Sequence, residues 1–167
     1  GDRRERGIIY DTVKELLGRL GYRVKSVWIP KKRERFSLDS DKLDAMLVAR
    51  ERLANAEDYV YSEPVIQVNA MLYTRVERPL ALRKITDLSG MTAITQLGSV
   101  YPQMSWHFRR GLIHRHDVIN ETSMLRMILA GRGDFAIVDR HVGNWLIAKH
   151  GWQGRLAGTP LGMSERE

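Results

Sequence analysis

Residues 129–140 read LAGRGDFAIVDR and end a short apolar run on an acid, Asp139. Gly131 is a fitting stop for the helical pattern before it, and DFAIV (134–138) has the length and composition of a buried strand. Asp139 therefore has two possible roles. Its carboxylate could cap the helix that follows, or it could face a ligand at the end of the strand.

Strand and helix patterns alternate through the second half of the chain. The expected strands are MTAITQ (91–96), HDVI (116–119) and DFAIV (134–138). The expected helices are one that opens after the glycine turn LGSVYPQ and runs to about Arg110, one over 121–131 capped by Asn120, and one over 140–151. Strands separated by such helices predict a parallel sheet covered on both faces.

The first half shows the same alternation and leads into a long extended segment. The expected elements are an amphipathic helix from Ile8 that stops at Gly21, a strand over 22–30, a short helix over 31–38 and a strand over 42–49. Residues 59–75, rich in valine and tyrosine, follow as an extended crossing. Two such series joined by one crossing predict two lobes and a hinge.

Composition narrows the class of protein. The chain has 167 residues, 43% hydrophobic and none of them cysteine, which fits a globular protein of one or two small domains without disulfides or thiolate metal sites. No apolar run reaches the ~20 residues needed to cross a bilayer. The first residues, GDRRERG, are neither a signal peptide nor a membrane anchor, so we expect the leader of an exported protein to have been removed.

The net charge of +7 is unevenly distributed. Residues 1–35 contain 11 lysines and arginines against 5 acids, whereas residues 36–167 contain 16 against 15. The basic run KKRER (31–35) has no interleaved aromatic residues, which a base-stacking surface would need. We interpret the excess as a solvated basic face and expect no nucleic-acid partner.

Three loops are expected after strand ends, where open α/β sheets bind ligands: 48–52, 98–100 and 139–140. Backbone amides around Ser99 could bind a carboxylate, and Asp139 would suit a cationic amine or a sugar hydroxyl. Capping of the following helices would explain both residues without any ligand. Trp28, which ends a predicted strand, is the one tryptophan expected near a cleft.

Patterns for catalysis and metal binding are weak. His114 and His116 are the only histidines close in sequence, and their spacing supplies two metal ligands without a third. The serine of LGSV lacks the flanking glycines of a nucleophile elbow. We expect no enzymatic activity, no metal and no cofactor.

Several short motifs occur in an order that is typical of one family. They are RGIIYDTVKELLGRLGYRV, PKKRER with DKLDAML, YVYSEPV, LRKITDLSGMTAITQLGS and LRMILAGRGDFAIVD. Over about residues 7–165 the chain resembles family 3 of the bacterial extracellular solute-binding proteins. The resemblance implies the type II periplasmic-binding-protein fold, an α/β fold of two lobes with parallel-rich sheets flanked by helices and a two-strand hinge.

The resemblance also implies roles for individual residues. In family members that bind amino acids, the last acid of the strand motif holds the α-amino group, and Asp139 occupies that place. A hydroxyl residue after the glycine of a Q-G-T loop contacts the ligand carboxylate. Ser99 matches that residue and has Gly98 and Val100 as its neighbours.

The sequence departs from the family pattern in two ways. Asn55 stands where members usually carry a carboxylate-binding arginine, and Arg50 or Arg52 could substitute for it. The family's first strand should precede RERG and a return segment should follow SERE. Either the chain is a fragment of a longer protein or its first lobe is pared down.

The predicted function is capture of a small polar, amino-acid-like solute without catalysis. The expected organisation is an incomplete lobe 1 over 1–66, lobe 2 over 67–157, a return crossing over 158–167, and hinge segments near 65–73 and 156–161. The protein would be monomeric and periplasmic or otherwise extracytoplasmic after signal-peptide removal, and would deliver the solute to the membrane permease of an ABC transporter. The alternative is the periplasmic ligand-sensing domain of a membrane signalling protein, which would carry a transmembrane helix and a signalling domain further along its gene.

Overall fold

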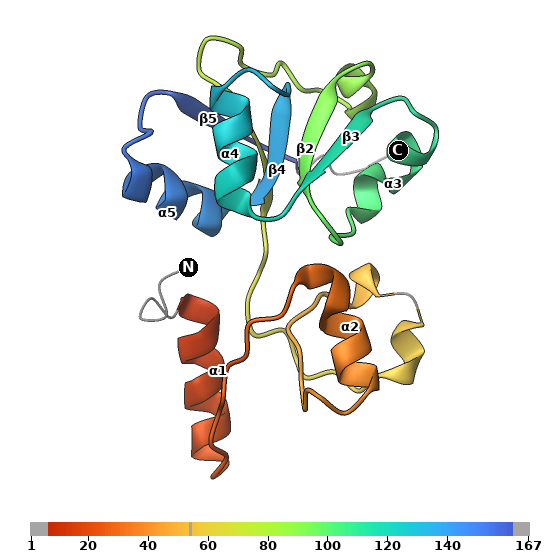
Figure 1. Cartoon of the computed structure of the whole chain (residues 1–167), viewed down its shortest axis with the longest axis vertical. Coiled ribbons are helices and arrows are strands. Elements are labelled where there is room, and N and C mark those ends of the chain that lie inside the picture. The colour runs from red at the N-terminus through yellow and green to blue at the C-terminus, as the bar shows by residue number, and fades with distance from the viewer. Residues whose placement is uncertain (1–6, 54, 162–167) are drawn as a thin grey trace. The chain divides into compact units, whose positions relative to one another are not determined.

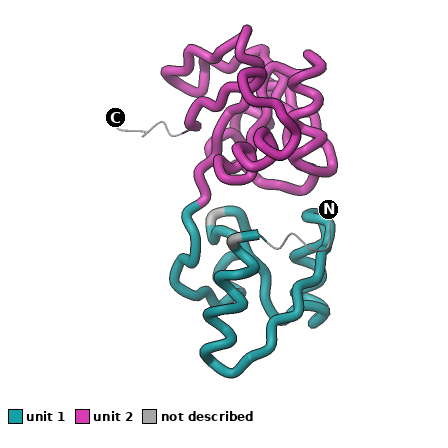
Figure 2. The backbone as a smooth tube through the Cα atoms, turned by 90° about the vertical axis from the view of Figure 1, so that its left-hand side faces the viewer, with its two compact units in different colours: residues 1–67 teal, residues 68–167 magenta. Residues whose placement is uncertain are grey.

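The computed structural model describes residues 7–53 and 55–161. The chain divides into two compact units, Gly1–Gln67 and Val68–Glu167, which Figure 2 colours separately. The basic residues before Gly7 and the end of the predicted return crossing, 162–167, lie outside the described residues. No helix in the described ranges is long and apolar enough to cross a membrane.

Unit 2 is built on a five-stranded mixed sheet (Figure 1). The strands are β1 (Ala70–Arg75), β2 (Thr92–Gln96), β3 (His114–Val118), β4 (Phe135–Asp139) and β5 (Leu156–Pro160), in the order β3-β2-β4-β1-β5. β2 pairs in parallel with β3 and β4, whereas β1 pairs antiparallel with β4 and β5. The predicted extended crossing (59–75) therefore ends in β1, which lies inside the sheet. Residues 156–160, part of the predicted hinge segment 156–161, form the edge strand β5 beside it.

Two apolar cores cover the two faces of this sheet. Successive residues of β4 point to opposite faces, so Phe135 and Ile137 join one core and Ala136 and Val138 the other. The helices α4 (Glu121–Leu129) and α5 (Arg140–His150) pack on one face, while α3 (Pro102–Arg109) packs on the other. No polar residue interrupts the apolar run FAIV, because β4 is buried on both of its faces.

Helix ends in unit 2 follow local sequence signals. Asn120 caps α4 by accepting a hydrogen bond from the Ser123 amide at 2.8 Å, as predicted. Gly151 ends α5 with φ 66°, a left-handed conformation that glycine adopts without a steric penalty. Asn120 thus fixes where α4 begins after β3, and Gly151 fixes where α5 ends before β5.

Tyr73 of β1 ties the start of α5 to the middle of the sheet. Its side chain is 1% exposed, and its hydroxyl lies 3.3 Å from the Arg140 carbonyl and 3.1 Å from Asn144 Oδ1. Burial, and after it the negative charge of Asp139, raises the pKa of Tyr73 to about 12. The positive charge of Arg140 acts in the opposite direction.

This raised pKa predicts a loss of stability at alkaline pH. The folded protein holds the Tyr73 proton more tightly than the unfolded chain, whose tyrosine pKa is near 10.0. The resulting stabilisation is present below pH 10 and decreases as the pH rises toward about 12. Denaturant unfolding of wild type and Tyr73→Phe at several pH values in this window should give a shallower pH dependence for the variant. Equal slopes would contradict the assignment.

Unit 1 contains helices and no strand among its described residues. Its helices are α1 (Ile8–Arg19) and α2 (Lys31–Asp39), with 3-10 turns at Arg50–Arg52 and Ala56–Asp58. The strands predicted over 22–30 and 42–49 are therefore wrong. A strand needs a neighbour that exchanges ladder hydrogen bonds with it, and none of the described backbone of unit 1 provides one.

Candidate functional site

Three loops of unit 2 leave the sheet at one edge. β2, β3 and β4 are parallel, so the segments 97–101, 119–120 and 139–140 all follow the carboxyl ends of strands. We call this the carboxyl edge. The antiparallel β1 begins at the same edge, because Ala70 pairs with Asp139. Convergent loops and helix starts make this the part of an α/β sheet best suited to bind a ligand.

Asp139 is held by backbone amides on both of its carboxylate oxygens. Oδ1 accepts from His141 N at 2.8 Å and Val142 N at 3.3 Å, so the residue caps α5, which is the first of its two possible roles. Oδ2 accepts from Asn69 N at 3.0 Å, and the Asn69 carbonyl accepts from Arg140 N at 2.9 Å. A carboxylate oxygen can accept two hydrogen bonds, so Oδ2 has capacity for one further donor. Capping and ligand binding are therefore compatible roles.

Ser99 does not cap a helix. The N-cap of α3 is Tyr101, without a side-chain cap, and Ser99 is 9% exposed in the loop before it. Its amide donates to the Gln96 carbonyl at 3.0 Å and its hydroxyl to Gln96 Oε1 at 3.0 Å. Gly98 has φ 84°, which turns the loop, and Val100 is 44% exposed. To bind a ligand through its hydroxyl, Ser99 would have to release Gln96 Oε1.

Two charged residues of β3 whose side chains lie beside the segment 95–99 were missed from sequence. Arg115 and Asp117 of β3 form an ion pair, with Nε and Oδ1 2.9 Å apart. The Ser99 carbonyl accepts from Arg115 at 3.0 Å, and Thr95 Oγ1 donates to Asp117 Oδ1 at 2.6 Å. The alternation in HRHDV places positions 115 and 117 on one face of a strand. No local pattern indicates that the loop after β2 meets that face.

The other candidate residues belong to unit 1. Trp28 is 85% exposed, and Arg50 and Arg52 form the first 3-10 turn. The Arg50 guanidinium lies 5.1 Å from the centre of the Tyr61 ring. Asn55 has φ 56°, in the left-handed region, and is the N-cap of the second 3-10 turn. The predicted roles of these four residues toward a ligand stay predictions.

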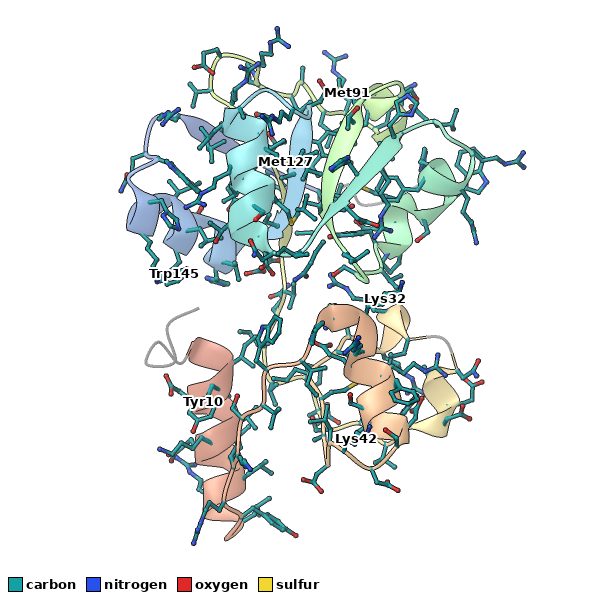
Figure 3. All side chains as sticks on the ribbon, in the orientation of Figure 1. Tyr10, Lys32, Lys42, Met91, Met127 and Trp145 are labelled. Carbon is teal, nitrogen blue, oxygen red and sulfur yellow. The ribbon has the colours of Figure 1, made fainter. Side chains whose placement is uncertain are left out.

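A cavity of about 410 Å³ also lies in unit 1. It is lined by Ile29, Pro30, Lys32, Arg33, Phe36, Ser37 and Lys42, of which Figure 3 labels Lys32 and Lys42. None of the eight candidate residues lines it, so it has no bearing on the predicted site. Within the described ranges, no three histidine, cysteine, aspartate or glutamate side chains gather as metal ligands.

Several solved structures are similar to this chain. An arginine 3rd transport system periplasmic binding protein from Legionella pneumophila matches at TM-score 0.74 and 15% identity, over 98% of this chain and 74% of that one. An ancestral arginine-binding protein bound to glutamine matches at TM-score 0.76 and 18% identity, over 99% and 73%. The GluR0 ligand-binding core from Nostoc punctiforme, in complex with L-glutamate, matches at TM-score 0.72 and 19% identity, over 98% and 74%.

The chain has the type II periplasmic-binding-protein fold. The α/β fold class expected from sequence is thus confirmed, although unit 1 shows no strand in its described part. No protein-family model matches the sequence, and no curated protein matches it either. At such identities the likeness establishes the fold and not the ligand.

Proposed function

We propose that the chain is an extracytoplasmic solute-binding protein whose ligand carries an ammonium group and a carboxylate. The observation that carries this proposal is the placement of Asp139 and the loop 98–100 on one edge of the sheet. Asp139 would accept a hydrogen bond from the ammonium group through Oδ2. The loop would donate to the carboxylate through the amides of Gly98 and Val100, and through the Ser99 hydroxyl once it releases Gln96 Oε1.

The similar structures support the chemical class of this ligand. Their bound molecules include arginine, glutamine and L-glutamate, which share an α-ammonium and an α-carboxylate group. They are binding proteins, and we propose the same non-catalytic role here. Closure of lobes 1–66 and 67–157 over the ligand, a monomeric state, a periplasmic location and delivery to an ABC permease are parts of the same proposal.

A thermal-shift screen tests the proposal. A ligand at about 100 times its dissociation constant stabilises the folded state by about 2.7 kcal/mol, so we expect the midpoint to rise by several degrees with at least one amino acid. Propionate and propylamine, which each carry only one of the two charged groups, should give smaller shifts. A screen of amino acids, opines, polyamines, small carboxylates and sugars without any shift would contradict the proposed role.

A further inference from the structure

Arg115 links the edge strand β3 to the loop that follows β2. One guanidinium nitrogen, Nη2, donates to the Ser99 carbonyl at 3.0 Å and lies 3.5 Å from the Gln96 carbonyl. The loop is also held by Leu97 N donating to the Val118 carbonyl at 2.8 Å, by the turn hydrogen bond from Ser99 N to Gln96 O, and by the Ser99 hydroxyl donating to Gln96 Oε1 at 3.0 Å. Among these contacts, Arg115 is the side chain that holds the Ser99 carbonyl.

The guanidinium itself is fixed from several directions. Its Nε pairs with Asp117 Oδ1 at 2.9 Å, and the same oxygen accepts from Thr95 Oγ1, which is 0% exposed within β2. The guanidinium carbon lies 5.4 Å from the Tyr101 ring centre and 5.6 Å from that of Phe108. The Arg115 and Asp117 side chains are only 29% and 32% exposed. A planar cation held by an acid and two rings is a rigid support for the carbonyl that it contacts.

We propose that Arg115 is a positioning residue for the carboxylate-binding loop 98–100. This inference rests on the proposed function of that loop. Gly98, with φ 84°, makes the loop backbone flexible, so the loop would sample several conformations if no side chain fixed it. Because Arg115 fixes the Ser99 carbonyl, the conformational entropy of the loop is lost during folding and not when the ligand binds.

A direct electrostatic role and a positioning role for Arg115 predict different ligand affinities for the variants Arg115→Lys and Asp117→Ala. Asp117 neutralises the guanidinium at 2.9 Å, so the pair adds little net charge to the carboxyl edge. If Arg115 acted by charge, Arg115→Lys would bind ligand like wild type, and Asp117→Ala would strengthen binding by exposing a free cation. If it acts by position, both variants weaken binding, because lysine lacks the planar fork and an unpaired arginine is no longer held.

Calorimetric titration with L-arginine, L-glutamine and L-glutamate separates the two cases. We expect Arg115→Lys, Arg115→Gln and Asp117→Ala each to weaken binding about tenfold or more, and Arg126→Gln, an exposed arginine of α4, to stay within about twofold of wild type. In the ligand-free protein, amide hydrogen exchange at Ser99 should accelerate in the Arg115 and Asp117 variants, while exchange in β1 and β4 stays unchanged. Wild-type-like binding by Arg115→Lys, or tighter binding by Asp117→Ala, would overturn the positioning role.

The exchange measurement keeps this inference separate from the proposed function. If folded wild type binds none of the three amino acids, the proposed ligand class is wrong. Faster exchange at Ser99 in Arg115→Gln would still show that Arg115 holds the loop. Unchanged exchange would overturn the inference regardless of which ligand binds.

Discussion

Residues 68–167 expressed alone should fold and unfold in one cooperative transition, and residues 1–67 alone should not. Every buried apolar side chain among the described residues lies in unit 2, between Leu72 and Leu161. Both cores are formed by unit 2 side chains only. A domain of this size with two sheet faces covered has a typical free energy of unfolding of about 5 kcal/mol or more.

Unit 1 lacks this source of stability. Ser37 is its only buried residue among the side chains described, whereas Leu20 is 70% exposed and Trp28 85%. Helices of 12 and 9 residues are marginal in water without an apolar face packed against a partner. Denaturant unfolding followed by near-ultraviolet circular dichroism checks both pieces. A cooperative transition for residues 1–67, or none for residues 68–167, would contradict this account.

Gly143→Ala should destabilise unit 2 by about 3 kcal/mol, the upper end of the usual cost of overpacking a core. A methyl carbon at position 143 would lie 2.3 Å from Cζ and from the hydroxyl oxygen of Tyr73. Tyr73 is 1% exposed and hydrogen-bonded through its hydroxyl, so its ring cannot move aside easily. The strain would fall on the first turns of α5, which Asp139 caps.

Gly18→Ala in α1 is the matched control. Both glycines are helical, but a methyl carbon at position 18 would meet nothing within 4 Å. Because alanine is the better helix former, this variant should leave the unfolding midpoint unchanged or raise it slightly. Equal midpoints for Gly143→Ala and wild type would show that the contact between α5 and β1 is looser than described.

The strands that sequence predicted correctly are those buried on both faces. FAIV and TAIT read as strands because their side chains are apolar or β-branched, and all of them except Thr92 and Thr95 belong to one of the two cores. The edge strand β3 spans His114–Val118, two residues ahead of its predicted start at His116, because its residues are polar and mostly exposed. The predicted strands of unit 1 are wrong because an alternating pattern, as in 22–30, or a compact apolar run, as in 42–49, indicates surface to bury and says nothing about whether a partner strand is present.

The candidate site was predictable only where a single loop defines it. Asp139 follows directly from its place after FAIV, and the glycine turn before α3 points to Ser99. Arg115 contacts Ser99 from 16 residues away in sequence and Asp117 contacts Thr95 from 22 residues away, so no spacing rule could have connected them to the loop. The antiparallel pairing that brings Asn69 against Asp139 likewise depends on the tertiary fold.

Asp139→Asn and Asp134→Asn, compared by calorimetric titration with the best ligand of the thermal-shift screen, test whether the Asp139 carboxylate binds the ligand. Asp139 ends β4 and Asp134 directly precedes it, and each carboxylate accepts a backbone hydrogen bond from a neighbouring segment, from Asn69 N at 3.0 Å and from Thr92 N at 2.7 Å. Asparagine also remains a good helix cap, so Asp139→Asn should still fold. We predict that Asp139→Asn abolishes measurable binding, whereas Asp134→Asn binds within about twofold of wild type. Wild-type affinity in folded Asp139→Asn would mean that this carboxylate serves only as a cap and that the carboxyl edge does not bind the ligand as described.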